Sequence, residues 1–272
     1  MTSEHLEIEQ KFEVPDSFTV PDLTAVPGVA QVEGPQEHHL LAVYYDTTDL
    51  RLLRAKVTLR RRTGGLDEGW HVKIPAGFGA RREMQLGLGP AGEPVPARVL
   101  DLVQDVSHGA ELSPVAVLRT TRRVRSLWSD TDEQLAEVAD DTVSATAYAG
   151  RPGGAASVTT WREVEVELYG GDEKFLVEVG RKLLDAGATA SGSASKLGRV
   201  LEDRLAEQEG TPPAAVDDAP EDPTAETGGT PKTAAAKVAE VEKDGKVEKD
   251  GKAKTGKAGK GQKAKTGKGK RK

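Results

Sequence analysis

The chain has 272 residues, a formal net charge of −6 and no cysteine. This length is enough for one sizeable domain and an additional segment, and the lack of cysteine excludes disulfides and thiolate metal sites. No apolar run approaches the roughly 20 residues that a membrane span requires, and the N-terminus lacks the basic and apolar regions of a signal peptide. We therefore expect a soluble cytoplasmic protein without a membrane partner.

Alternation of apolar and charged residues dominates the first three quarters of the chain. A period of two residues is typical of strands, and it predicts strands over 6–14, 40–46, 56–63, 69–75, 80–88, 115–128, 134–141 and 161–169. Helical spacing of apolar residues predicts helices over 172–186, over 94–104 and after Ser195, which would cap the last of them. Many strands with few interleaved helices indicate an antiparallel sheet, closed or packed, with helices outside it.

The hydrophobic pattern stops after Leu205. Residues 206–230 form an acidic linker rich in Pro and Ala, and residues 231–272 form a basic tail rich in Lys, Gly and Ala. Residues 207–230 carry seven acidic residues and no Lys or Arg, whereas residues 231–272 carry 15 basic against five acidic residues. Neither segment has the apolar surface that offsets chain entropy. Both are predicted to be disordered, and the folded domain to span residues 1–205.

Charged residues recur on one face of strand after strand. In an ordinary antiparallel sheet that face is solvated, but here acids gather in the first and last strands and bases in the middle ones. In a closed barrel of about eight strands, residues alternate between interior and exterior. Charged faces that point inward would offer hard oxygen ligands for Mg²⁺ or Mn²⁺ and Arg and Lys donors for a polyphosphate.

Several motifs also follow one another in a characteristic order. They are Glu7-Ile8-Glu9-Gln10-Lys11, Tyr44-Tyr45-Asp46-Thr47, Leu59-Arg60-Arg61-Arg62, Lys73, Arg81-x-Glu83, Arg123-x-Arg125, Glu137 with Asp141, Glu163-x-Glu165-x-Glu167 and Ser195-Lys196. This series resembles the CYTH superfamily, also called triphosphate tunnel metalloenzymes, over residues 4–204. The resemblance implies an α+β, mainly β fold: a closed eight-stranded antiparallel tunnel with flanking helices, followed here by the disordered C-terminal tail.

The resemblance also implies roles for individual residues. The metal ligands for Mg²⁺ or Mn²⁺ would be Glu7, Glu9, Glu165 and Glu167. The triphosphate would be bound by Lys11, Arg60, Arg62, Lys73, Arg81, Arg123, Arg125 and Lys196. Supporting carboxylates, which orient the basic groups or hold a second metal, would be Glu83, Glu137, Asp141 and Glu163. The residues expected to be catalytic are Glu7, Glu9, Lys11 and Lys73.

Two other positions carry structural expectations. Asp46 or Thr47 is expected to cap the turn that follows them, because short polar side chains accept hydrogen bonds from nearby backbone amides. Of the five histidines, His71 is the one expected near the site, because it shares a strand face with Lys73.

The implied activity is hydrolysis of a triphosphate, with inorganic triphosphate as the main candidate and nucleoside or thiamine triphosphate as related ones. Two alternatives stay open: a class IV-type adenylate cyclase and a polyphosphate-binding module without turnover. The charges of the tunnel do not separate hydrolase from cyclase, whereas the full carboxylate set argues against a pure binding module. For the basic tail, binding of nucleic acid or polyphosphate through counterion release and a solubilising role are equally open.

Overall fold

The computed structural model describes residues 2–77, 79–90, 93–150 and 154–209. These residues belong to one compact unit, Met1–Ala215. The basic tail and nearly all of the acidic linker lie outside the described residues, so their predicted disorder stays a prediction. Among the described helices, none has the length and apolar character needed to cross a membrane.

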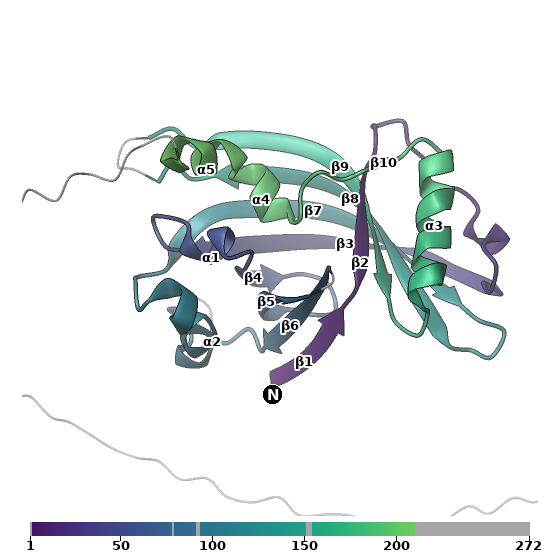
Figure 1. Cartoon of the computed structure of the whole chain (residues 1–272), viewed down its shortest axis with the longest axis horizontal. Helices are drawn as coiled ribbons and strands as arrows, with labels where there is room; N and C mark the ends of the chain where they lie inside the picture. Colours follow the sequence, from purple (N-terminus) through teal and green to yellow (C-terminus); the bar gives the residue numbers. More distant parts are fainter. Residues whose placement is uncertain (1, 78, 91–92, 151–153, 210–272) are drawn as a thin grey trace, which may run out of the picture. The chain divides into compact units, whose positions relative to one another are not determined.

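The described residues contain ten strands in one antiparallel sheet. Their order is β1-β6-β5-β4-β3-β7-β8-β9-β2-β10, and Figure 1 shows the long strands β3, β7, β8 and β9 as neighbours behind the opening segment. Their bounds are β1 Thr2–Glu7, β2 Glu9–Glu13, β3 Gln31–Asp46, β4 Thr58–Thr63, β5 Gly69–Gly77, β6 Ala80–Leu86, β7 Ser113–Trp128, β8 Gln134–Ala147, β9 Ser157–Leu168 and β10 Thr189–Ala190.

The opening segment joins the two halves of this sheet. β1 pairs with β6, where Glu7 lies opposite Arg81, and β2 pairs with β9, where Glu9 lies opposite Glu167. A single residue, Ile8, separates β1 from β2. The predicted strand 6–14 is therefore divided, because its two halves take different partners.

The prediction of a mainly β, antiparallel sheet with a few helices is confirmed. Two details differ from the predicted eight-stranded closed tunnel. The sheet has ten strands among the described residues, and its hydrogen-bonded order is open, with β1 at one end and the two-residue β10 at the other. β1 and β2 are not neighbours in this order, and the covalent chain at Ile8 connects them.

The helices lie between or after the strands. They are α1 Arg51–Arg54, α2 Ala97–Ser107, α3 Glu173–Asp185, α4 Lys196–Val200 and α5 Glu202–Glu209, with a 3₁₀ turn at Leu23–Ala25. The predicted last helix is divided at Leu201, and its second part reaches beyond the predicted domain boundary at residue 205. The one-turn α1 is too short to show helical periodicity in the sequence.

Asp46 holds α1 in place. Its buried carboxylate accepts hydrogen bonds from the backbone amides of Thr47, Leu52 and Leu53, at 2.7, 2.9 and 2.9 Å. The expectation that Asp46 caps the following turn is confirmed, and the motif at 44–47 serves the fold at this residue.

Three hydrophobic clusters cover the two faces of the sheet at different places. α3 packs on β2, β8 and β9 through Leu176, Val179 and Leu183, and α2 packs on β4, β5 and β6 through Val99 and Val103. Leu197 of α4, and Leu201 between α4 and α5, pack on another set of residues, in β3, β7, β8 and β9.

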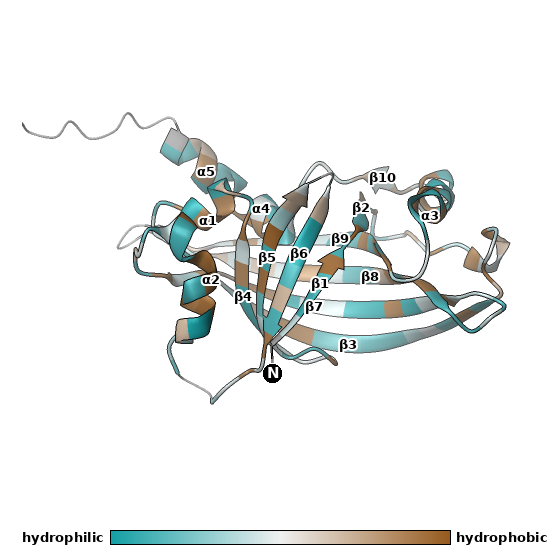
Figure 2. Cartoon of the chain, turned by 60° about the horizontal axis from the view of Figure 1, so that its bottom comes forward, coloured by the Kyte–Doolittle hydropathy of each residue, from teal (hydrophilic) through white to brown (hydrophobic). Residues whose placement is uncertain are grey.

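The clusters show which face of each strand bears the charges. In β9, Val164 and Val166 pack in the cluster of α3, whereas Trp161 packs in the cluster of α4. Since successive side chains of a strand point to opposite faces, Glu163, Glu165 and Glu167 share the face of Trp161. Figure 2 shows this change between hydrophilic and hydrophobic residues along the strands. The charged face therefore lies opposite α3.

Candidate active site

Side chains from eight strands and α4 line one cavity, which we call the lumen. Its charged lining residues are Glu7, Glu9, Lys11, Arg60, Arg62, Asp67, Lys73, Arg81, Glu83, Arg122, Glu165, Glu167 and Lys196, together with the polar residues Tyr44, Thr58 and Ser195. Seven of these residues are basic and six are acidic. Because the two kinds are nearly balanced, most cationic groups of the lumen already have an anionic neighbour.

Lys11 and Lys73 each bridge two carboxylates. The Lys11 ammonium lies 2.8 Å from Glu9 and also contacts Glu165, which is its register partner across β2 and β9. The Lys73 ammonium contacts Glu7 and lies 3.4 Å from Glu83. Burial alone would lower the pKa of Lys11, but Glu165 and Glu9 outweigh it and raise the pKa above its usual value. The ammonium is thus held in its charged form.

Lys196 enters the lumen from the first residue of α4. The Ser195 hydroxyl caps this helix by accepting from the Gly198 amide at 3.0 Å. The Lys196 ammonium lies 2.9 Å from Asp141 and 2.8 Å from Glu165, and it contacts Glu163. Burial would lower the pKa of Lys196, yet these carboxylates raise it well above the ordinary value.

Arg122 completes this cluster from β7. Its guanidinium donates two hydrogen bonds to Asp141, at 2.8 and 2.7 Å, and one to Glu165 at 2.6 Å. Burial would raise the pKa of Asp141, but Arg122 and Lys196 hold it below its usual range. Asp141 therefore stays ionised and fixes both basic groups.

Two groups of carboxylates are relevant to a metal. Ligand atoms of Asp141, Glu163 and Glu165 lie within 4.8 Å of one another, and no other described group of three meets this criterion. The Lys196 ammonium already contacts all three. Of the four carboxylates predicted as metal ligands, this group contains Glu165.

The second group consists of Glu7, Glu9, Glu165 and Glu167, from β1, β2 and β9. Glu7 is buried, and its Oε2 atom has no hydrogen-bond partner. Burial raises the pKa of Glu167 to about 7, and the nearby charges of Glu7 and Glu9 contribute to the increase. An unpaired buried oxygen and mutual repulsion are relieved when a cation is bound. The donor set therefore fits a hard divalent cation.

Glu83 organises the basic wall formed by β4 and β5. It accepts a hydrogen bond from His71 at 2.6 Å and lies 3.4 Å from Lys73 and 3.9 Å from Arg60. Burial would raise the pKa of Glu83, but Lys73, the His71 hydrogen bond and Arg60 hold it far below the usual range. Glu83 thus fixes basic groups, as expected of a supporting carboxylate.

Other lumen residues have local partners. Arg60 donates to the Tyr44 hydroxyl at 3.3 Å, and Arg62 is buried and paired with Asp67. Tyr44, to which the sequence analysis gave no role in the site, also lines the lumen. Its pKa, which burial would raise, is lowered by the Arg60 charge.

Two predicted arginines lie elsewhere. Arg123 points away from the lumen and pairs with Glu37 at 3.0 Å, with 45% of its side chain exposed. Arg125 shares that face of β7 by strand alternation, and its buried Nη1 atom has no hydrogen-bond partner. Arg122, which the sequence analysis did not select, takes the lumen position instead.

Glu137 and His5 lie at the edge of the site. Glu137 is opposite Glu167 in the register of β8 and β9, and burial raises its pKa. His5 lies 3.4 Å from Glu83 and 4.0 Å from Glu167. Its position two residues before Glu7 places both on one strand face, so alternation alone would have identified His5 alongside His71.

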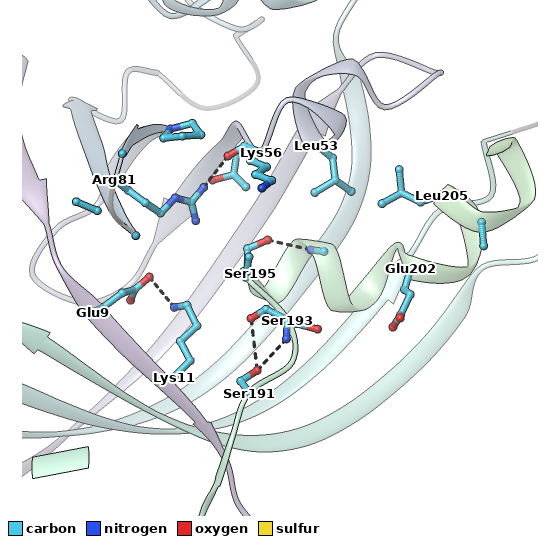
Figure 3. Close-up of a pocket in the computed structure, with 18 residues that line it drawn as sticks. Glu9, Lys11, Leu53, Lys56, Arg81, Ser191, Ser193, Ser195, Glu202 and Leu205 are labelled. Carbon is cyan, nitrogen blue, oxygen red and sulfur yellow. Dashed lines mark hydrogen bonds and ion pairs between the residues drawn. The ribbon is translucent and has the colours of Figure 1, made fainter. Parts of the chain in front are cut away.

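An outer cavity of about 840 Å³ adjoins the lumen. The two share Glu9, Lys11, Thr58, Arg81 and Ser195, and the outer cavity continues to α5. Arg81 lines both cavities, and its guanidinium donates to the Lys56 carbonyl at 3.1 Å (Figure 3). Arg81 is therefore placed to contact a ligand that enters from this side.

A family comparison agrees with the geometry. The CYTH domain family matches residues 5–200. The chain belongs to the CYTH domain family. Two curated relatives, the uncharacterized proteins Rv2226 and MT2285 of Mycobacterium tuberculosis strains H37Rv and CDC 1551, are 40% identical over 206 residues. The match covers 72% of this chain and about 40% of the length of these relatives.

The solved structures that match this chain have low sequence identity to it. A candidate adenylate cyclase from Bacillus halodurans is 20% identical, with a TM-score of 0.48 over 72% of this chain and 97% of that one. HpAC1 from Hippeastrum, for which a dominant triphosphatase activity is described, is 16% identical, with a TM-score of 0.48 over 73% and 95%.

Proposed function

We propose that this CYTH-domain protein is a metal-dependent hydrolase of a triphosphate, with inorganic triphosphate as its main substrate and Mg²⁺ or Mn²⁺ as its metal. The carrying observation is the lumen itself, where a carboxylate set that fits a divalent cation faces lysines and arginines from several strands. A highly charged anion needs both parts, because cations must neutralise its oxygens and donors must orient them.

In this proposal the chain's own residues mainly position the substrate. Lys11, Lys73, Arg60 and Arg122 donate to phosphate oxygens, the arginines with their two-pronged geometry and the lysines as point charges. Glu7, Glu9, Glu165 and Glu167 hold the metal, which when bound neutralises phosphate charge and lowers the pKa of coordinated water. Holding the reacting groups in line contributes a large share of the rate enhancement.

The proposal includes a lumen wall that is continuous around the ligand. The two-sided pairing of the opening segment supports it, since residues on either side of Ile8 pair with β6 and β9. Glu7 and Glu9 are thereby held two residues apart, on either side of the junction between β1 and β2.

The test is a substrate screen on the purified protein. Inorganic triphosphate, thiamine triphosphate and ATP are each incubated with Mg²⁺ or Mn²⁺, and orthophosphate and cyclic AMP are measured. Release of orthophosphate is expected, fastest from inorganic triphosphate. Cyclic AMP as the main product would assign the protein as a cyclase, and tight triphosphate binding without turnover would make it a binding module.

A pair of variants tests the site. Glu9→Gln keeps the shape of a lumen carboxylate but removes its charge, so loss of turnover is expected. Glu4→Gln is the matched control, because Glu4 is exposed on β1 and pairs with Arg82 at 3.2 Å. A fully active Glu9→Gln protein would contradict the assigned site.

A further inference from the structure

The proposed metal ligands are engaged by lysines of the same chain. Lys73 contacts Glu7, and Lys11 contacts Glu9 and Glu165. Three of the four carboxylates thus have an ammonium group as direct neighbour. The same two lysines are proposed to bind phosphate. The carboxylates and the phosphate therefore compete for the same two ammonium groups.

We propose that Lys11 and Lys73 are exchangeable counter-ions, which leave their carboxylates when a divalent cation binds there and then pair with phosphate oxygens. This inference rests on the proposed function and deepens it. It assigns the two lysines a role in coupling the cation to the anion, in addition to a role in holding the anion.

The physical reason is competition for the same oxygens. A carboxylate oxygen directed at a divalent cation is no longer available to an ammonium group. A largely buried ammonium without an anionic partner is costly, and both lysine side chains are largely buried, with 15% and 13% exposed for Lys11 and Lys73. A phosphate oxygen restores the missing partner. Each ligand therefore makes binding of the other more favourable, and this coupling is reciprocal.

Lys196 differs from these two lysines. Like Lys11 it contacts Glu165, but its other two partners, Asp141 and Glu163, are buried and lie outside the proposed metal-ligand set. Its backbone is fixed at the capped start of α4, anchored by the buried Leu197. We therefore assign Lys196 as a fixed cation, which keeps Asp141 and Glu163 when the metal binds.

The experiment measures Mn²⁺ affinity of the full chain from the electron paramagnetic resonance signal of free Mn²⁺, without substrate. Lys11→Met and Lys73→Met each remove a competing cation, and Mn²⁺ binding is expected to tighten about fivefold or more, the lower range of measured couplings. Lys73→Arg restores a cation and is expected to return the affinity toward that of the unaltered protein.

Two control variants separate exchange from general electrostatics. Arg60→Met removes a lumen charge whose neighbours are Tyr44 and Glu83, outside the proposed metal-ligand set. Lys174→Met removes an exposed charge on α3. Both are expected to change Mn²⁺ affinity less than twofold. Equal tightening in Arg60→Met and the two lysine variants, or no tightening in the lysine variants, would overturn the inference.

A measurement on the unaltered protein covers the case in which the methionine variants do not fold. Sulfate replaces chloride at constant ionic strength, and Mn²⁺ affinity is corrected for ion pairing in solution. Tighter Mn²⁺ binding with sulfate is expected, and unchanged or weaker binding would overturn the exchange. If the unaltered protein binds no Mn²⁺ at all, the proposed metal site itself fails, which distinguishes that outcome from failure of the exchange alone.

Discussion

Glu167 is a lumen carboxylate whose pKa in the folded chain, about 7, lies well above the ordinary value of 4.5. Its burial and its acidic neighbours favour the protonated form in the folded state only. Between pH 4.5 and 7 the folded state binds more protons at this group than the unfolded state does. The contribution of Glu167 to stability is therefore fully present below pH 4.5 and is lost as the pH rises through 7.

Substitution of Glu167 by Gln tests whether this group lowers the stability of the fold as the pH rises. At pH 8, with EDTA present, the variant is expected to be more stable than the unaltered protein by up to about 3 kcal/mol, because it removes a buried charge next to like charges. Near pH 4.5 the two proteins should unfold at similar urea concentrations. The same stability difference at both pH values would contradict the pKa assignment.

Arg122 and Arg123 form a neighbouring pair on opposite faces of β7. Arg122→Ala is expected to lower kcat/KM for triphosphate about 100-fold or more, the cost of removing one oriented donor. Arg123→Ala should stay within about twofold, because Arg123 pairs with Glu37 outside the lumen.

Loss of Arg122 also removes two hydrogen bonds from the buried Asp141 and leaves it the Lys196 ammonium, which destabilises the fold. Arg122→Lys keeps the charge, so it separates stability from turnover when thermal melting is measured beside activity. A larger loss of activity in Arg123→Ala than in Arg122→Ala would place the wrong face of β7 in the lumen.

Alternation along β7 alone does not determine which of these two arginines faces the lumen. β7 has buried residues on both faces, with Leu118 in the cluster of α4 and Leu127 in the cluster of α3. The apolar face thus changes sides within one strand. For β2 and β9, whose outer face is apolar and inner face charged, the sequence predicted Lys11, Glu165 and Glu167 in the lumen, and the structure brings them together.

At the scale of elements, periodicity predicted β7 and α3 within two residues of their observed bounds, but it predicted only residues 40–46 of β3 and 134–141 of β8. The breaks at Ile8 and Leu201 were not predicted. Each break depends on which neighbouring element the chain contacts before it and which it contacts after it. α1 depends on the Asp46 carboxylate, so a four-residue helix without its own periodicity is defined by a tertiary hydrogen-bond network.

Helix α3 offers a matched pair for stability. Leu183 is fully buried against the sheet, whereas its neighbour Leu184 is 45% exposed. Leu183→Ala is expected to cost 2–5 kcal/mol, typical of a cavity left in a packed core, and Leu184→Ala less than about 1 kcal/mol. Urea unfolding measures both. Because α3 lies on the face opposite the lumen charges, turnover per folded molecule should be unchanged, and a specific loss of turnover would contradict this placement.

At the scale of the whole molecule, a chain that ends at residue 215 separates the compact unit from the basic tail. It is expected to keep the thermal midpoint and triphosphate turnover of the full chain, because residues 207–230 carry seven acids and few apolar groups. The full chain should bind long-chain polyphosphate at low salt and lose about tenfold or more in affinity between 50 and 200 mM salt. Equal polyphosphate binding by both chains would show that the tail is not responsible.

The one-residue junction at Ile8 has a consequence for how the protein is made. Residues 2–13 leave the ribosome before their partners, which extend to Leu86 on one side and Glu167 on the other. β2 must therefore wait for its partner β9 until most of the domain has emerged. Such distant pairing slows folding and prolongs the exposure of unpaired strands. The segment that joins β6 to β9 thus lacks part of its strand pairing until nearly the whole domain has been translated.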